Sequence, residues 1–177
     1  KFFIEGYYIG SGQMRPALSA GVCDTISVEL HSDVSPFNIL FTGKSVINTT
    51  GNGTFNFPIS VIGNNYFIVV YSRNSLKTWS SGAVLFGSNT SYDFSTLASK
   101  AFGNNLRDLG DGNFALFSGD VTQDGQINID DYNEIMNATQ LFLSGYLKDD
   151  ITGDNLIDSS DFTLIENNNS LRFTMHP

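Results

Sequence analysis

The chain has 177 residues, of which 41% are hydrophobic and fifteen are phenylalanine, so it can form a core and is not globally disordered. Its formal net charge is −9, and because it has no basic patch the sequence gives no support for nucleic-acid binding. The charge is uneven, because residues 120–161 hold ten acidic side chains and one basic one, whereas the rest of the chain carries eight of each.

Cys23 is the single cysteine, so the chain forms no internal disulfide. No stretch is long and apolar enough to span a membrane, and no signal peptide opens the chain. Because the sequence starts inside a strand-like run, we expect it to be a mature fragment or one piece of a longer polypeptide.

The first half of the chain has the residue pattern of β-strands. In one apolar run Ile26, Val28 and Leu30 alternate with polar residues, which indicates one buried face, and the almost wholly apolar run 67–71 is expected to be a central strand. Strands this close together, without helices between them, predict an antiparallel β-sandwich. The predicted strands are residues 1–8, 25–31, 37–42, 53–62 and 66–71, with a further short strand at 83–86.

The pattern changes in the second half. Residues 96–103 predict one or two helical turns, and residues 114–118 predict a last strand. Apolar positions at helical spacing then predict a helix at 131–145 and a second helix that begins at 161 and ends in the Asn run at 167–169.

The fold class we expect is therefore mainly β with a small α part. We place a domain boundary after residue 117, with a β-sandwich domain at 1–117 and a smaller module of loops and helices at 118–177.

Residues 120–131, called loop 1 below, have the spacing of an EF-hand-type calcium loop. Ca²⁺ prefers six to eight oxygen ligands, so alternate residues of a tight loop must point inward. Gly125 at position 6 permits the sharp turn, and Ile127 at position 8 is the expected apolar anchor that pairs the loop with another. The predicted ligands at positions 1, 3, 5, 7, 9 and 12 are Asp120, Thr122, Asp124, Gln126 through its backbone carbonyl, Asn128 and Asp131.

The same spacing recurs thirty residues later, in residues 150–161, called loop 2. Ile157 again stands at position 8, and Asn155 replaces the glycine of position 6, which is tolerable because Asn is the next most permissive residue for a left-handed turn. Two Asx-rich surface turns are the alternative, but turn chemistry does not explain this spacing twice. The predicted ligands of loop 2 are Asp150, Thr152, Asp154, Leu156 through its carbonyl, Asp158 and Asp161, so we expect two Ca²⁺ ions.

Without a cation the clustered carboxylates of both loops repel one another. The sequence therefore predicts that residues 119–170 unfold when calcium is removed, while the β-domain keeps its sheet.

The two segments GDVTQDGQINIDDY and DDITGDNLIDSSDF resemble a type I dockerin module, the calcium-binding duplication that docks into cohesin domains. The preceding segments NYFIVVYSRNSLKTWSSGAV and SYDFSTLASKAFGNNLRDLGDGNFALFSGDV resemble the β-domain before dockerin-like repeats in large secreted Bacteroidota proteins, which commonly use type IX secretion. The resemblance implies calcium at the ligands named above, an extracellular or cell-surface location, and a non-catalytic structural or assembly role.

The expected partners are other domains of the same polypeptide or a surface protein. Cohesin docking is an alternative, although the residues at loop positions 10 and 11, which carry recognition in that family, differ between the loops: Ile129 and Asp130 in one, Ser159 and Ser160 in the other.

Trp79 and the tyrosines would suit a sugar-stacking platform, so a carbohydrate-binding module of a surface adhesin or glycan-degrading protein is a second alternative. Core packing is the commoner role of aromatic side chains, and we favour it. An enzyme has little support, because His31 and His176 are the only histidines, Cys23 has no evident base, and no Gly-x-Ser-x-Gly motif is present.

Overall fold

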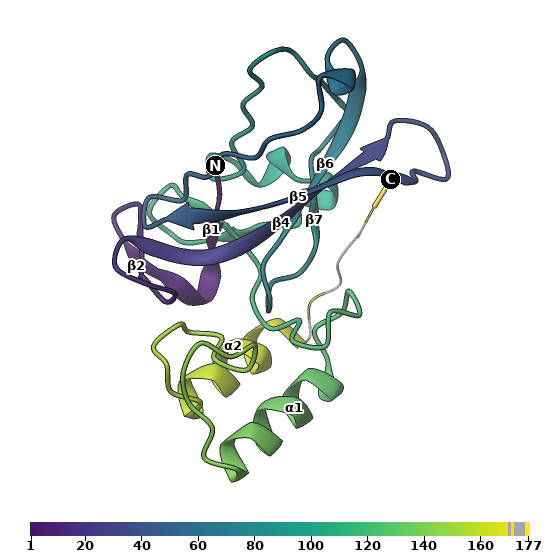
Figure 1. The fold of residues 1–177 in the computed structure, drawn as a ribbon. Helices are drawn as coiled ribbons and strands as arrows, with labels where there is room; N and C mark the ends of the chain where they lie inside the picture. The colour runs from purple at the N-terminus through teal and green to yellow at the C-terminus, as the bar shows by residue number, and fades with distance from the viewer. Residues whose placement is uncertain (170, 172–175) are drawn as a thin grey trace.

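The structure, a computed structural model, describes residues 1–169, 171 and 176–177. It has a β-rich part, residues 1–117, and a paired-loop part, residues 118–169, which carries both helices and lies below the sheets in Figure 1. The prediction of a mainly β fold with a small α part is confirmed. The described strands are β1 Phe3–Ile4, β2 Tyr8–Gly10, β3 Gln13–Met14, β4 Val22–Ser32, β5 Ile39–Asn48, β6 Asn65–Tyr71, β7 Thr78–Trp79, β8 Val84–Leu85, β9 Arg107–Asp108 and β10 Phe114–Leu116, and the helices are α1 Ile129–Gln140 and α2 Ser159–Asn169.

The largest sheet has the strand order β5-β4-β6-β7, with β8 also paired to β6, and all of these pairs are antiparallel. Ile26, Val28 and Leu30 of β4 are buried on one face, as their alternation predicts. The apolar run of β6 lies between β4 and β7, which confirms that it is a central strand. Two smaller sheets are β1-β10-β9, in which β1 and β10 run parallel, and the pair β2-β3.

The prediction of a strand at residues 53–62 is wrong. The segment is irregular and ends in a single 3-10 turn, Ile59–Val61. Phe55 and Phe57 alternate with polar residues, which gives the segment a strand-like sequence pattern. In the structure both side chains are partly buried and pack against the core of the sheet. Pro58 lacks an N–H group and cannot donate to a β-ladder, so side-chain packing and the local hydrogen bonds of the 3-10 turn hold this segment in place of strand pairing.

Two further predicted elements are shorter or interrupted. The run 1–8 is split, because the 3-10 turn Glu5–Tyr7 separates β1 from β2. Helix α1 ends at Gln140 and not at 145, because Phe142 has a positive φ of 52° that leaves the helical conformation. The region 96–103 contains 3-10 turns, as predicted, and α2 ends in the Asn run.

Three apolar clusters form the core of the described part of the chain. One lies on the inner face of the largest sheet, and a second, on its outer face, contains Phe67, Val69 and Trp79. The third fills the paired-loop part, where Leu76 from the β-rich part packs with residues of the loops and helices. The two parts are therefore packed against each other, and the domain boundary after residue 117 stays a prediction.

Candidate metal site

Loops 1 and 2 have the same backbone conformation at matching positions. Position 6 has a positive φ in both, 87° at Gly125 and 67° at Asn155, so Asn155 takes the left-handed conformation expected of it. Position 4 is also left-handed, with φ of 60° at Gln123 and 69° at Gly153. The repeat in the sequence is therefore a repeat in the backbone.

The carboxylate at position 12 closes each loop. In loop 1 Asp131 accepts hydrogen bonds from the backbone N–H groups of Thr122 and Asn128 at 3.0 and 2.9 Å. In loop 2 Asp161 accepts the corresponding bonds from Thr152 and Asp158 at 2.9 and 3.0 Å. These bonds bring positions 3, 9 and 12 together in both loops.

Position 9 starts the helix that follows each loop. The Asn128 side chain accepts the Asp130 N–H at 2.7 Å, and together with Asp131 it forms a capping box at the start of α1. Asp158 accepts the Ser160 N–H at 2.8 Å in the same way. The spacing that suits a metal loop therefore also caps two helices.

Position 5 makes a local turn in each loop. Asp124 accepts the Gln126 N–H at 2.8 Å, and Asp154 accepts the Leu156 N–H at 2.9 Å. The side chains of Gln126 and Leu156 are exposed, as position 7 permits, since only its backbone carbonyl is an expected ligand.

Position 1 differs between the loops. Asp120 is fully buried, and only its Oδ2 accepts a hydrogen bond, from the Gly125 N–H at 3.2 Å, so its Oδ1 has no hydrogen-bond partner. Both oxygens of Asp150 are used instead, by the N–H groups of Asp154 and Asn155, each at 3.1 Å.

The charges around position 1 differ as well. Burial and the neighbouring carboxylates of Asp131 and Asp124 raise the pKa of Asp120 to about 7. Burial also raises the pKa of Asp150, but the Asn155 N–H and the Arg73 charge act against that rise.

The two loops share one apolar core. The position-8 residues Ile127 and Ile157 are both buried in the cluster of the paired-loop part, as expected of apolar anchors. After the loops, the rings of Tyr132 and Phe162, which are thirty residues apart in sequence, have centroids 4.9 Å apart. The loops and helices therefore form one internally repeated unit.

Among the described residues, no three His, Cys, Asp or Glu side chains form a group that could hold a metal ion. Five of the twelve expected ligands belong to other residue types, and the loop carboxylates accept N–H groups of their own loop. Two of the predicted ligand atoms are buried without a hydrogen-bond partner, Oδ1 of Asp120 in loop 1 and Oγ1 of Thr152 in loop 2, and the carboxylate oxygen of Asp120 is the one whose charge suits a cation. An all-oxygen donor set suits a hard cation such as Ca²⁺.

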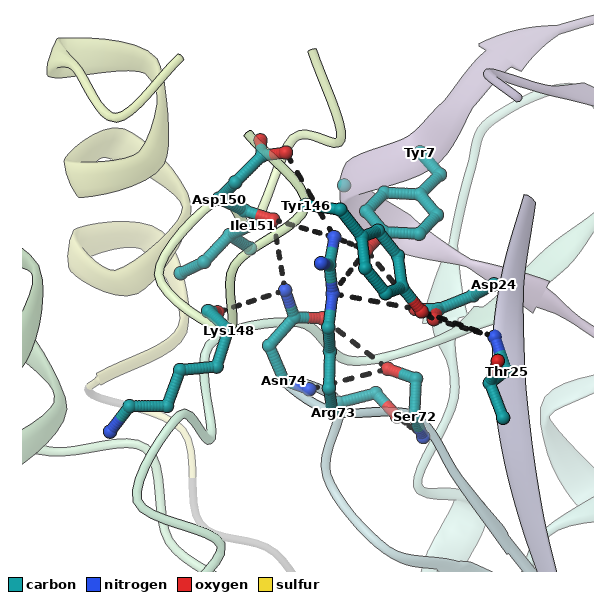
Figure 2. Close-up of polar contacts among 12 residues, drawn as sticks. Tyr7, Asp24, Thr25, Ser72, Arg73, Asn74, Tyr146, Lys148, Asp150 and Ile151 are labelled. Carbon is teal, nitrogen blue, oxygen red and sulfur yellow. Dashed lines mark hydrogen bonds and ion pairs between the residues drawn. The ribbon is translucent and has the colours of Figure 1, made fainter. Parts of the chain in front are cut away.

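The β-rich part contacts loop 2 through side chains that the sequence patterns did not single out. The Arg73 guanidinium is 3.9 Å from the Asp150 carboxylate and donates to the Asp150 backbone carbonyl at 3.4 Å. Asn74 donates to the same carbonyl at 3.0 Å and to that of Lys148 at 3.1 Å. Figure 2 shows Arg73 and Asn74 between the loop-2 segment and the strands of the β-rich part.

Arg73 is itself held in place on its other side. It donates to the Tyr7 hydroxyl at 2.6 Å, pairs with Asp24 at 3.8 Å, and lies 3.6 Å from the centroid of the Tyr146 ring (Figure 2). The Tyr146 hydroxyl in turn donates to Asp24. No sequence signal marks this cluster, because its members are far apart along the chain.

Two more contacts reach loop 2 from the N-terminal segment. Arg15 donates to the Thr152 carbonyl at 3.0 Å and lies 3.6 Å from the Asp154 carboxylate. Gly6 passes so close to the Ile151 carbonyl that a Cβ atom there would overlap its oxygen. Loop 2 is therefore built against the β-rich part.

The other candidate residues from the sequence lie inside the β-rich part. Trp79 is 9% exposed and packs against Phe67, which confirms core packing for this residue. Both ring nitrogens of His31 are engaged, one 2.8 Å from the Phe37 carbonyl and the other 2.9 Å from Glu29.

Cys23 is fully buried, and burial raises the pKa of its thiol to about 12. At neutral pH it therefore carries almost no thiolate, which is the nucleophilic form.

Comparisons with protein-family models, curated proteins and solved structures returned no match. Within the described part of the chain, neither helix has the length and apolar character needed to cross a membrane.

Proposed function

We propose that the chain binds two Ca²⁺ ions through loops 1 and 2, and that it is a non-catalytic structural or assembly module of a secreted or cell-surface bacterial protein. The proposed ligands are the six residues of each loop named from the sequence. The observation that carries the proposal is the buried Oδ1 of Asp120, which has no partner, at position 1 of a loop whose fold is repeated thirty residues later.

A bound cation would neutralise carboxylates that the fold places close together. In loop 1, Asp131 and Asp124 lie near enough to Asp120 to raise its pKa, and among the described residues no Lys or Arg nitrogen lies within 4.0 Å of these three carboxylates. Such a group is costly without a counter-charge, which the raised pKa of Asp120 reflects. The role we assign to calcium is therefore to stabilise the paired-loop part.

The titratable groups of these loops give little support to a catalytic role, because Asp120, whose pKa is raised, is fully buried away from any substrate. Acid–base chemistry needs a titratable side chain within hydrogen-bond reach of a substrate. The carboxylates at position 12 are occupied by loop N–H groups, and both nitrogens of His31 are bonded within the β-rich part.

Isothermal calorimetry on chelator-stripped protein tests the proposal. We expect two Ca²⁺ per chain, and Asp124→Ala should remove or severely weaken one of them. The matched control is Asp130→Ala, which removes an exposed acid at position 11 of the same loop and should leave both sites intact. Absence of calcium binding by the wild-type chain would reject the proposal.

A specific observation also favours the docking alternative. Ile129 and Met136 lie two turns apart on α1 and are 60% and 37% exposed, and Phe142, just after the helix, is 92% exposed. Exposed apolar side chains on one helix face suit a protein partner. Interferometry with immobilised type I cohesin domains tests this alternative: binding that Ile129→Asp abolishes supports it, and no binding in calcium excludes it.

The carbohydrate-binding alternative is weakened, because Trp79, the aromatic side chain proposed to stack on a sugar, is buried. A hollow of about 660 Å³ beside Phe55, Phe57 and Tyr92 is one place where the β-rich part could hold a glycan. A glycan array that gives no saturable binding would exclude this alternative.

A further inference from the structure

Two arginine side chains of the β-rich part, Arg73 and Arg15, lie beside carboxylates of loop 2. The Arg73 guanidinium lies 3.9 Å from the carboxylate at position 1, and the Arg15 guanidinium lies 3.6 Å from the carboxylate at position 5. Each arginine also donates to a backbone carbonyl of the same loop, at Asp150 and Thr152. Both guanidinium groups therefore contact the loop at its charged groups and at its backbone.

Arg73 cannot easily move away from this position. Its side chain is 15% exposed and is bonded to the Tyr7 hydroxyl, paired with Asp24 and stacked on Tyr146. A charge that is fixed by its other partners acts on the loop without the entropy loss of ordering a free side chain.

A guanidinium near a ligand carboxylate has two effects. It offsets the repulsion among the loop carboxylates, as a metal ion does, and so it stabilises the metal-free loop. It also repels an incoming cation and competes for the same carboxylate, which weakens metal binding. In the described part of the chain, the carboxylates of loop 1 have no arginine or lysine at ion-pair distance.

We propose that Arg73 and Arg15 are positioning residues that hold loop 2 in its folded form without metal and lower its affinity for Ca²⁺ relative to loop 1. The loops then fill in order, loop 1 first, and only loop 1 depends on calcium for its folded form. This inference rests on the proposed function. It changes the expectation from sequence, which treated the two loops alike and predicted that residues 119–170 unfold together.

Hydrogen exchange with mass spectrometry on the full chain tests the claim that the two arginines keep loop 2 folded without metal. In excess chelator, amides of residues 120–131 should lose protection while those of residues 150–161 keep it. Arg73→Gln should remove the protection of residues 150–161 in chelator, and Arg73→Lys, which keeps the charge, should restore part of it. Equal loss of protection in both loops of the wild-type chain would overturn the inference.

Calcium titration by calorimetry tests the claim that the arginines lower the affinity of loop 2 for Ca²⁺. Two sites of different affinity are expected, and Arg15→Gln should tighten the weaker site about threefold, the scale of a partly exposed ion pair. Arg15 is suitable because its side chain is 38% exposed, so its replacement leaves the core packing unchanged, whereas the Arg73 side chain is only 15% exposed. The control is Lys77→Gln, which removes a cation paired with Glu29 inside the β-rich part and should change neither site.

The outcomes separate the two claims. Two calcium sites of equal affinity, unchanged by Arg15→Gln, would leave the proposed function standing and reject this inference. No calcium binding by the wild-type chain would reject both.

Discussion

Loops 1 and 2 have the same ligand spacing, the same left-handed positions and the same closing hydrogen bonds, but different neighbours. Asp120 has a buried oxygen without a partner, whereas both oxygens of Asp150 accept N–H groups, and Arg73 lies beside it. The comparison shows that a duplicated sequence fixes the internal geometry of each loop. The electrostatic environment of each loop comes instead from the part of the fold against which it packs.

The two helices also share a repeated pattern that changes where one of them meets the β-rich part. Buried residues recur at matching positions, Ile135 in α1 and Ile165 in α2. The next buried position breaks the match, since it is Ala138 in α1 and Asn168 in α2. Asn168 donates to Glu5 at 2.7 Å, so the departure occurs where α2 meets the β-rich part.

The largest expected effect tests whether the two repeats share one core. Ile135→Ala and Ile165→Ala each remove a fully buried side chain, and each should lower the free energy of unfolding by about 2–5 kcal/mol. Similar losses are expected because the two side chains occupy matching positions in one cluster. Urea unfolding in excess calcium measures this, with the exposed Asn137→Ala and Asn167→Ala as controls. A loss in only one of the two isoleucine variants would contradict a shared core.

A second prediction breaks the contact that distinguishes loop 2. Gly6→Ala places a Cβ against the Ile151 carbonyl oxygen, and because that oxygen belongs to the backbone the loop must shift. We expect a loss of about 1–3 kcal/mol and faster amide exchange in residues 150–161 than in residues 120–131. Gly82→Ala is the matched control, since a Cβ there meets open space. Equal exchange changes in both loops would show that loop 2 does not depend on this contact.

The smallest expected effect concerns the β-rich part alone. Burial by itself would raise the pKa of Glu29, but hydrogen bonds from His31 and Tyr71 and the Lys77 charge outweigh burial and lower it. A carboxyl group with a lowered folded-state pKa stabilises the fold above its unfolded pKa, and this stabilisation is lost as the pH falls through the folded-state value. Glu29→Gln should therefore cost about 1–2 kcal/mol at pH 7.

The cost of Glu29→Gln should shrink at pH values below the unfolded-state pKa of 4.5. Urea unfolding of both proteins at pH 7 and at about pH 3.5 measures the difference. The difference should be independent of calcium, because the partners of Glu29 all belong to the β-rich part. A cost that grows on acidification would contradict the prediction.

Local sequence patterns correctly predicted the elements in which burial follows a regular period along the chain. The apolar run of β6 and the alternation in β4 are of this kind, as are the left-handed turn at Asn155 and the shared burial of Ile127 and Ile157. Each follows from the period of a strand or from the sterics of a turn, which act between residues close together in the chain.

The same patterns failed where packing overrides local preference. Residues 53–62 look like a strand, but Phe55 and Phe57 pack against the core without pairing to a neighbour. A strand needs a partner for its backbone groups, and a single segment does not reveal whether one is free.

The sequence by itself determined the two loops, their spacing and the residues that their internal hydrogen bonds join, because these bonds link groups at most ten residues apart. Only the tertiary structure decided that Arg73, seventy-seven residues before Asp150, lies beside loop 2. Charge acts through space, so its effect on a loop depends on which distant side chains the fold brings within a few ångströms. For that reason two loops with one ligand pattern differ in their expected dependence on metal.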